Sequence, residues 1–134
     1  MRNVNSGLLI LRLTVGLLMI PHGINKLVHP AALDYVKSTL MDKGLPFWIA
    51  YLVFLSEIIA PLFVVLGFRT RGAAFVMFLG GLMTLYLAYS NVLFATTEHG
   101  GWAPELPALF MFGALVLCFT GGGKMAVSHR HKWD

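Results

Sequence analysis

Residues 46–66 read PFWIAYLVFLSEIIAPLFVVL, and this stretch decides the fold. Glu57 is the only charged residue in it. A transmembrane helix needs about 20 predominantly apolar residues, because the hydrocarbon core of a bilayer is about 30 Å thick. The stretch therefore predicts a membrane-spanning helix.

Three further apolar runs flank this one, near residues 7–27, 73–94 and 103–120, the last beginning with the charged Glu105. All are expected to be helices, because lipid offers no partner for unpaired backbone N–H and C=O groups. The prediction is an all-α integral membrane four-helix bundle, with residues 1–134 forming a single transmembrane domain.

The composition agrees with a chain whose outer surface meets lipid. Hydrophobic residues make up 57% of the 134 residues and charged residues only 12%, and the mean hydropathy is +0.75. A soluble domain carries about twice that share of charge. The lipid bilayer is therefore the expected partner of most of the surface.

The basic residues predict the orientation. The N-terminus, the second connection and the tail would share one side of the membrane, and the first and third connections the other. Lys and Arg in short segments favour the cytoplasmic side, which predicts that both termini are cytoplasmic (N-in/C-in). The same placement explains the net charge of +4 without a nucleic-acid partner. The first side carries six basic residues and the other side three: Arg2, Arg69, Arg71, Lys124, Arg130 and Lys132 against Lys26, Lys37 and Lys43.

The first connection, residues 29–45, is long and mixed in character. Leu33, Val36 and Leu40 stand at i, i+3 and i+7, which places them on one face of a helix. This spacing predicts a short amphipathic helix that lies at the membrane surface between the first two spans.

Arg12 and Glu57 are charged residues inside apolar spans, where a lone charge costs about 2.5 kcal/mol or more. Counted from the cytoplasmic ends of their helices, their depths differ by about 6 Å. We therefore expect a buried ion pair between Arg12 and Glu57. Two roles stay open for it, a device that fixes helix register and part of a ligand or proton path.

A second polar cluster lies at the C-terminal end of the first span. His22, Asn25 and Lys26 share a helix face near the outer interface. With Glu98 and His99 from the third connection they form a candidate polar pocket, in which a histidine beside a carboxylate could exchange protons near neutral pH. The alternative is a helix end whose polar and basic groups simply suit the helix dipole and the lipid headgroups.

The sequence predicts no metal site and no intrinsic cofactor. His22 is the only histidine inside a predicted span, and no H-x-x-H or C-x-x-C pair occurs. Cys118 is a lone thiol in an apolar run and cannot close an internal disulfide. Nucleotide-binding and hydrolase motifs are also missing from the sequence.

The chain resembles the DoxX family of small four-span bacterial membrane proteins. The resemblance implies a multi-pass protein of the bacterial cell (inner) membrane, linked to quinone-dependent or oxidative-stress-related oxidoreduction, with quinone as the ligand. The resemblance extends over nearly the whole chain. The residues that carry it are Arg12 and Gly16, His22-Gly23 with Lys26-Leu27, Glu57, Gly67-Phe68-Arg69-Thr70-Arg71 and Gly100-Gly101-Trp102.

Three functions remain open at this stage. The first is a subunit of a quinone-linked oxidoreductase system, with a protein partner that supplies the redox chemistry. The second is a non-catalytic scaffold or assembly partner. The third is a small-solute or proton transporter, for which four short helices would have to open or form a homo-oligomer. The sequence leaves open whether the chain is an enzyme, and fold analogy alone does not decide between these functions.

Overall fold

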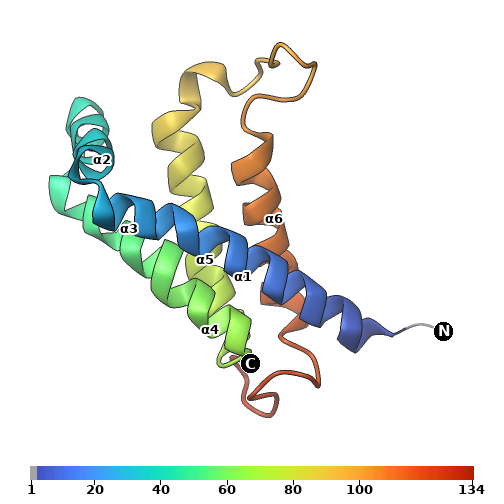
Figure 1. Ribbon diagram of the computed structural model, residues 1–134. Helices are drawn as coiled ribbons and strands as arrows, with labels where there is room; N and C mark the ends of the chain where they lie inside the picture. Colours follow the sequence, from blue (N-terminus) through green and yellow to red (C-terminus); the bar gives the residue numbers. More distant parts are fainter. Residues whose placement is uncertain (1–2) are drawn as a thin grey trace.

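The computed structural model describes residues 3–134, so Arg2, one of the basic residues behind the predicted orientation, lies outside the described residues. Figure 1 shows the helices gathered into one bundle, in which α1 runs diagonally across the view beside the second span. The first span is α1 (Val4–Val28), whose N-terminus is capped by the Asn3 side chain. The predicted short helix follows it as α2 (Pro30–Asp42), with Pro30 in the first turn.

The second span is one continuous rod built from four helical pieces: η1 (Phe47–Tyr51), α3 (Leu52–Phe54), η2 (Leu55–Ile59) and α4 (Ala60–Leu66). The piece η2 is a turn of π-helix, in which the Ala60 N–H bonds the Leu55 carbonyl. Pro61 follows directly and has no N–H to offer its preceding turn. Such π turns often occur at functional sites.

The remaining elements are α5 (Thr70–Ala88), η3 (Ser90–Val92) and α6 (Glu105–Thr120). The expected third helix near residues 73–94 ends earlier than predicted, because the chain leaves helical geometry at Tyr89. By length and composition α1, the rod 47–66 and α5 can each cross a membrane, whereas α6 is a shorter apolar helix.

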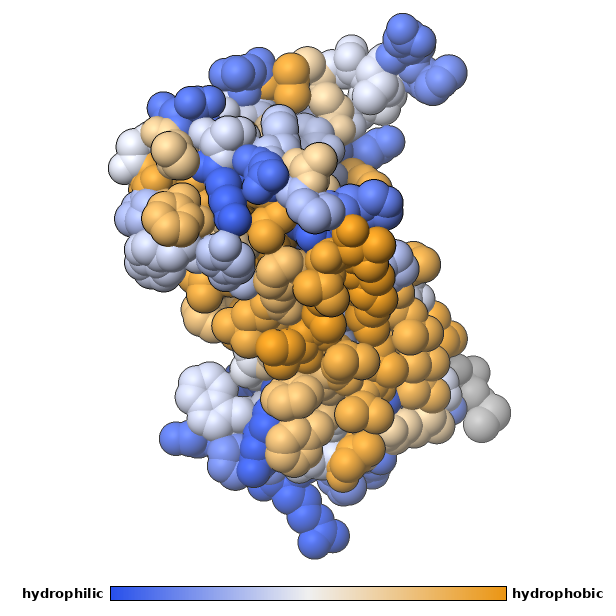
Figure 2. Space-filling model, turned by 60° about the vertical axis from the view of Figure 1, so that its left-hand side comes forward, coloured by the Kyte–Doolittle hydropathy of each residue, from blue (hydrophilic) through white to orange (hydrophobic). Residues whose placement is uncertain are grey.

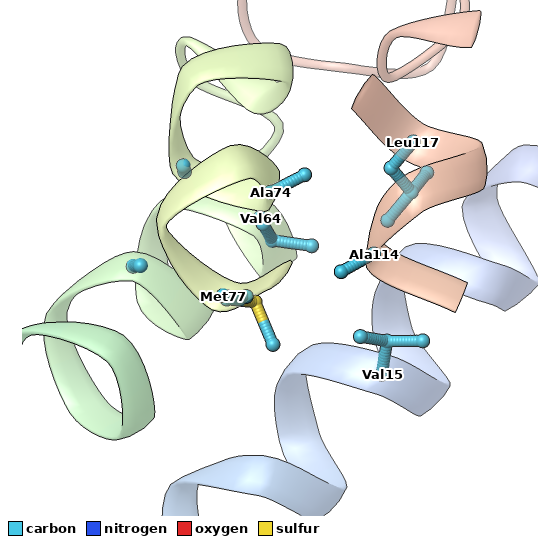
Figure 3. Packing of buried hydrophobic residues seen from close by; sticks show 8 residues of the cluster. Val15, Val64, Ala74, Met77, Ala114 and Leu117 are labelled. Atoms are coloured by element: carbon cyan, nitrogen blue, oxygen red, sulfur yellow. The ribbon is translucent and has the colours of Figure 1, made fainter. Parts of the chain in front are cut away.

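The core lies where α1, α4, α5 and α6 meet. Val15, Val64, Ala74 and Leu117 come from these four helices and are almost completely buried. Figure 3 shows them pointing toward one another, together with Met77 and Ala114. Small side chains let membrane helices pack closely, since packing rather than hydrophobic exclusion drives their association.

The outside of the bundle is strongly apolar. Figure 2 shows a hydrophobic belt between two polar ends on the face in view. Because water would not solvate so large an apolar surface, the belt contacts the bilayer. The exposed large side chains on α1, α4, α5 and α6 include Leu17, Leu18, Phe63, Phe75, Leu109, Phe112 and Phe119.

The tail after α6 folds back onto one end of the bundle, near the turn between α4 and α5 (Figure 1). The N–H of Val127 bonds the Leu66 carbonyl at 3.2 Å, and the N–H of Ser128 bonds the Gly67 carbonyl at 3.0 Å. The Trp133 carbonyl accepts from the N–H of Arg71 at 3.0 Å. The tail is thus a packed part of the structure.

Candidate functional site

Lys26 and Glu57 form an ion pair inside the bundle. Lys26 Nζ lies 2.7 Å from Glu57 Oε2 and donates a hydrogen bond to it. The side chains are 20% and 11% exposed, respectively. Lys26 stands in the last turn of α1 and Glu57 in the π turn of the second span. Each charge lowers the cost of removing the other from water.

Two glycines allow the neighbouring helices to approach the pair. A Cβ on Gly23 of α1 would lie 2.5 Å from Ile58 Cγ1 and 3.0 Å from Glu57 Cβ. A Cβ on Gly80 of α5 would lie 2.6 Å from Ser56 Cβ. Real Cβ atoms do not approach so closely, so the absence of a side chain at Gly23 and Gly80 lets α1 and α5 pack against the turn that carries Glu57.

A cavity of about 640 Å³ opens beside this pair. Its walls come from α1, α2, the second span, α5 and the start of α6, and they are mainly apolar. Their polar groups belong to His22, Lys26, Tyr35, Thr39, Ser56, Glu57, Thr84 and Tyr89. A largely apolar cavity with a few polar groups in one region is typical of a small-molecule site.

The helix α2 covers one side of the cavity. Leu40 is fully buried there, and Lys43 Nζ donates to Ser90 Oγ at 3.0 Å while lying 4.7 Å from the centroid of the Tyr86 ring. Lys37 lies 4.7 Å from the Tyr51 ring centroid, and a hydrogen bond with Tyr51 raises the pKa of Lys37. Lys37 therefore ties α2 to the second span, and Lys43 ties the end of α2 to the end of α5 and to η3.

The predicted Arg12–Glu57 ion pair is wrong, because Glu57 binds Lys26 instead. Gly16 of α1 lies against Pro61 and Val65, and Arg12, one turn earlier, lies against Gly67. Glu57 stands ten residues before Gly67, or about 15 Å along the helix. The depths of Arg12 and Glu57 therefore differ by far more than an arginine side chain can reach.

The structure does not bring the five residues of the candidate polar pocket together. His22 and Lys26 line the cavity, and the His22 ring meets the Phe110 ring edge-on with centroids 5.8 Å apart. Asn25 is exposed and does not line it. Glu98 and His99 are also exposed, in the connection between α5 and α6, and do not complete the pocket.

Sequence reasoning missed Ser56 and Thr84 as cavity residues. Thr84 Oγ1 donates to the Gly80 carbonyl at 3.0 Å and Ser56 Oγ to the Val53 carbonyl at 3.2 Å, so both hydroxyls are held near the wall. The available signal in the sequence was the spacing of Gly80 and Thr84, small residues four apart on one face of a helix. Within residues 3–134, His, Cys, Asp and Glu nowhere gather in a group of three that could hold a metal ion.

Three apolar helices long enough to cross a bilayer, packed in one bundle with a shorter apolar helix, define a polytopic α-helical membrane protein. The family profile described as DoxX matches residues 7–90, which is more than half of the sequence, and the chain belongs to the DoxX family. The matched range includes Lys26 and Glu57, whereas α6 and the tail follow it. Neither a curated protein nor a solved structure matches the chain.

Proposed function

We propose that this chain is a subunit of a quinone-linked or oxidative-stress-related redox system of the bacterial inner membrane, and that its cavity binds the quinone ring. The observation that carries the proposal is the ion pair of Lys26 and Glu57 at the edge of an apolar cavity. A quinone matches such a site, because it combines an apolar ring with two carbonyl acceptors.

The polar groups suit this ligand. The Lys26 ammonium has three donors and gives one to Glu57, so another can reach a quinone carbonyl. Met19, Met77 and Phe110 supply apolar and polarizable surface for the ring. These side chains bind a ligand and move protons but do not carry electrons, so the proposal assigns the electron supply to a partner subunit.

The test is quinone binding by the full chain, purified in quinone-free detergent micelles and titrated with decyl-ubiquinone in a calorimeter. We expect saturable binding that Lys26→Gln weakens about tenfold, the value of one hydrogen bond from a charged donor. Lys124→Gln, an exposed lysine at the other end of the bundle, is the matched control. Absence of heat in the wild-type titration, or equal binding by Lys26→Gln, would count against the proposal.

The proposed orientation places both termini in the cytoplasm. It is supported by the basic residues of the tail and of the α4–α5 turn, which lie together at one end of the bundle. A fluorescent reporter fused after Asp134 should fold and fluoresce, and an alkaline phosphatase fused there should be inactive. The opposite pattern would reverse the orientation.

A further inference from the structure

Arg12 is a buried charge that the ion pair of the cavity does not use. The residue is 1% exposed. Its Nη2 donates to the Met125 carbonyl at 3.2 Å, while Nε and Nη1 are buried without any hydrogen-bond partner. An unpaired guanidinium removed from water costs several kcal/mol. The Met125 carbonyl is thus the one hydrogen-bond partner of this guanidinium within residues 3–134.

The carboxylates within residues 3–134 do not pair with Arg12. The sequence has six Asp and Glu residues. Asp34 and Asp42 lie on α2, and Glu98 and Glu105 lie at the α5–α6 connection, all at the opposite end of the bundle. Glu57 is paired with Lys26.

Asp134 has the one acidic side chain at the same end as Arg12, and both of its side-chain oxygens accept hydrogen bonds. It accepts hydrogen bonds from Ser128 Oγ at 2.6 Å, from the N–H groups of Arg130 and His131 at 2.9 and 2.6 Å, and from Arg69 at 3.2 Å. No contact joins it to Arg12. Among residues 3–134, Arg12 therefore makes no ion pair with a carboxylate.

A second unpaired donor stands beside Arg12. Thr70 is fully buried, and its Oγ1 has no hydrogen-bond partner. A Cβ on Gly122 would lie 2.7 Å from Thr70 Oγ1 and 3.4 Å from Arg12 Cδ, so both side chains pack against Gly122. Thr70 is the first residue of the 19-residue helix α5, and the next two N–H groups of that helix, of Arg71 and Gly72, bond the Trp133 carbonyl.

We propose that Arg12 and Thr70 bind a tetrahedral oxyanion of the phosphate class, beneath the segment 121–128 of the tail. The anion neutralises the guanidinium and accepts hydrogen bonds from Arg12 and from the Thr70 hydroxyl, which is the arrangement that charge-assisted recognition of phosphate requires. The same chemistry is offered by free inorganic phosphate and by the phosphodiester of a lipid headgroup.

Thermal unfolding of the full chain in phosphate-free dodecyl maltoside tests this site. One arm adds sodium phosphate at constant ionic strength, and the other adds dioleoyl-phosphatidylglycerol without phosphate. We expect one arm to raise the Tm saturably. The responding arm identifies the source of the anion.

Thr70→Val separates binding from folding, whereas Arg12→Gln can fail to fold. The hydroxyl of Thr70 is unpaired without a ligand, so Thr70→Val should leave the ligand-free Tm unchanged or raise it. It should nevertheless weaken the midpoint of the response about tenfold. Arg130→Gln, an exposed arginine at the same end, should respond as the wild type does. No response in either arm, or an unchanged midpoint in Thr70→Val, would overturn the proposal.

Discussion

Glu57 faces a helix that offers two cations, Arg12 and Lys26, and it binds the second. Both cations lie on the stripe of α1 that also carries Gly16 and Gly23, the positions in closest contact with the second span. They are 14 residues apart, which corresponds to about 21 Å along a helix. The choice of partner therefore depends entirely on the register between the two helices.

Replacing only one residue of the Lys26–Glu57 pair should destabilise the fold more than replacing both with apolar residues. We expect Lys26→Met or Glu57→Leu alone to cost about 3 kcal/mol, because each leaves its partner charged and poorly solvated. The double variant should cost clearly less than the sum of the two. The measurement is a double-mutant cycle on the free energy of unfolding in detergent. Strictly additive costs would show that the two side chains do not interact.

The sequence identifies Arg12, Glu57, His22 and Lys26 as residues of consequence, because polar groups inside long apolar runs are conspicuous. It does not show which cation meets the carboxylate. Helical periodicity places Arg12 and Lys26 on the same face, and estimating depth from helix ends assumes that the two helices start level. The contact of Gly16 with Pro61 and Val65 shows that they do not.

At the scale of helices, the register between α1 and the second span rests on two glycines. Gly16→Ala and Gly23→Ala would each bring a methyl group into atoms of the second span. Overpacking of this kind costs about 1–3 kcal/mol. Gly7→Ala in the same helix has open space around it and is the control. Thermal unfolding should show lower Tm for the first two variants and an unchanged or higher Tm for the control.

The helices themselves are predictable from the sequence to different degrees. Long apolar runs give α1, the rod 47–66 and α5, since only helices satisfy their backbone in lipid. The spacing of Leu33, Val36 and Leu40 gives α2. The tail has no helical periodicity of apolar residues. Its position depends on partners distant in the sequence, such as Leu66 and Gly67, which no local pattern indicates.

The docked tail should respond to acid. Burial alone would raise the pKa of the Asp134 carboxyl, but hydrogen bonds from Ser128, His131, Arg69 and Arg130 hold that pKa well below its usual range. The ordinary pKa of an Asp is about 3.9. The carboxylate therefore stabilises the docked tail above that pH, and the stabilisation is lost as the pH falls toward the folded-state pKa.

Trp133 reports the state of the tail in a background where Trp48 and Trp102 are replaced by Phe. We expect its fluorescence to be constant from pH 7 to 5 and to change below about pH 4. Asp134→Asn should remove this pH dependence, and Asp34→Asn on α2 should preserve it. A transition near pH 6 would point to a histidine rather than to Asp134.

Across the whole molecule, the two polar centres lie at opposite ends of one apolar belt. Lys26 and Glu57 belong to the end covered by α2, and Arg12 and Thr70 to the end covered by the tail. Sites this far apart with no shared partner usually behave independently. The effects of Lys26→Met and Thr70→Val on the free energy of unfolding should therefore add within about 0.5 kcal/mol. A larger coupling would show that the belt transmits strain between the ends.

The shortness of α6 has a consequence for the surrounding lipid. Its 16 residues extend about 24 Å, less than the hydrocarbon thickness of about 30 Å. Acyl chains beside α6 must then shorten or disorder to keep water from the apolar surface, at a cost of a fraction of a kcal/mol for each Å of mismatch. The bilayer is therefore thinner beside α6 than beside the longer helices. A second protein with an equally short helix would reduce the cost of this thinning by binding next to α6.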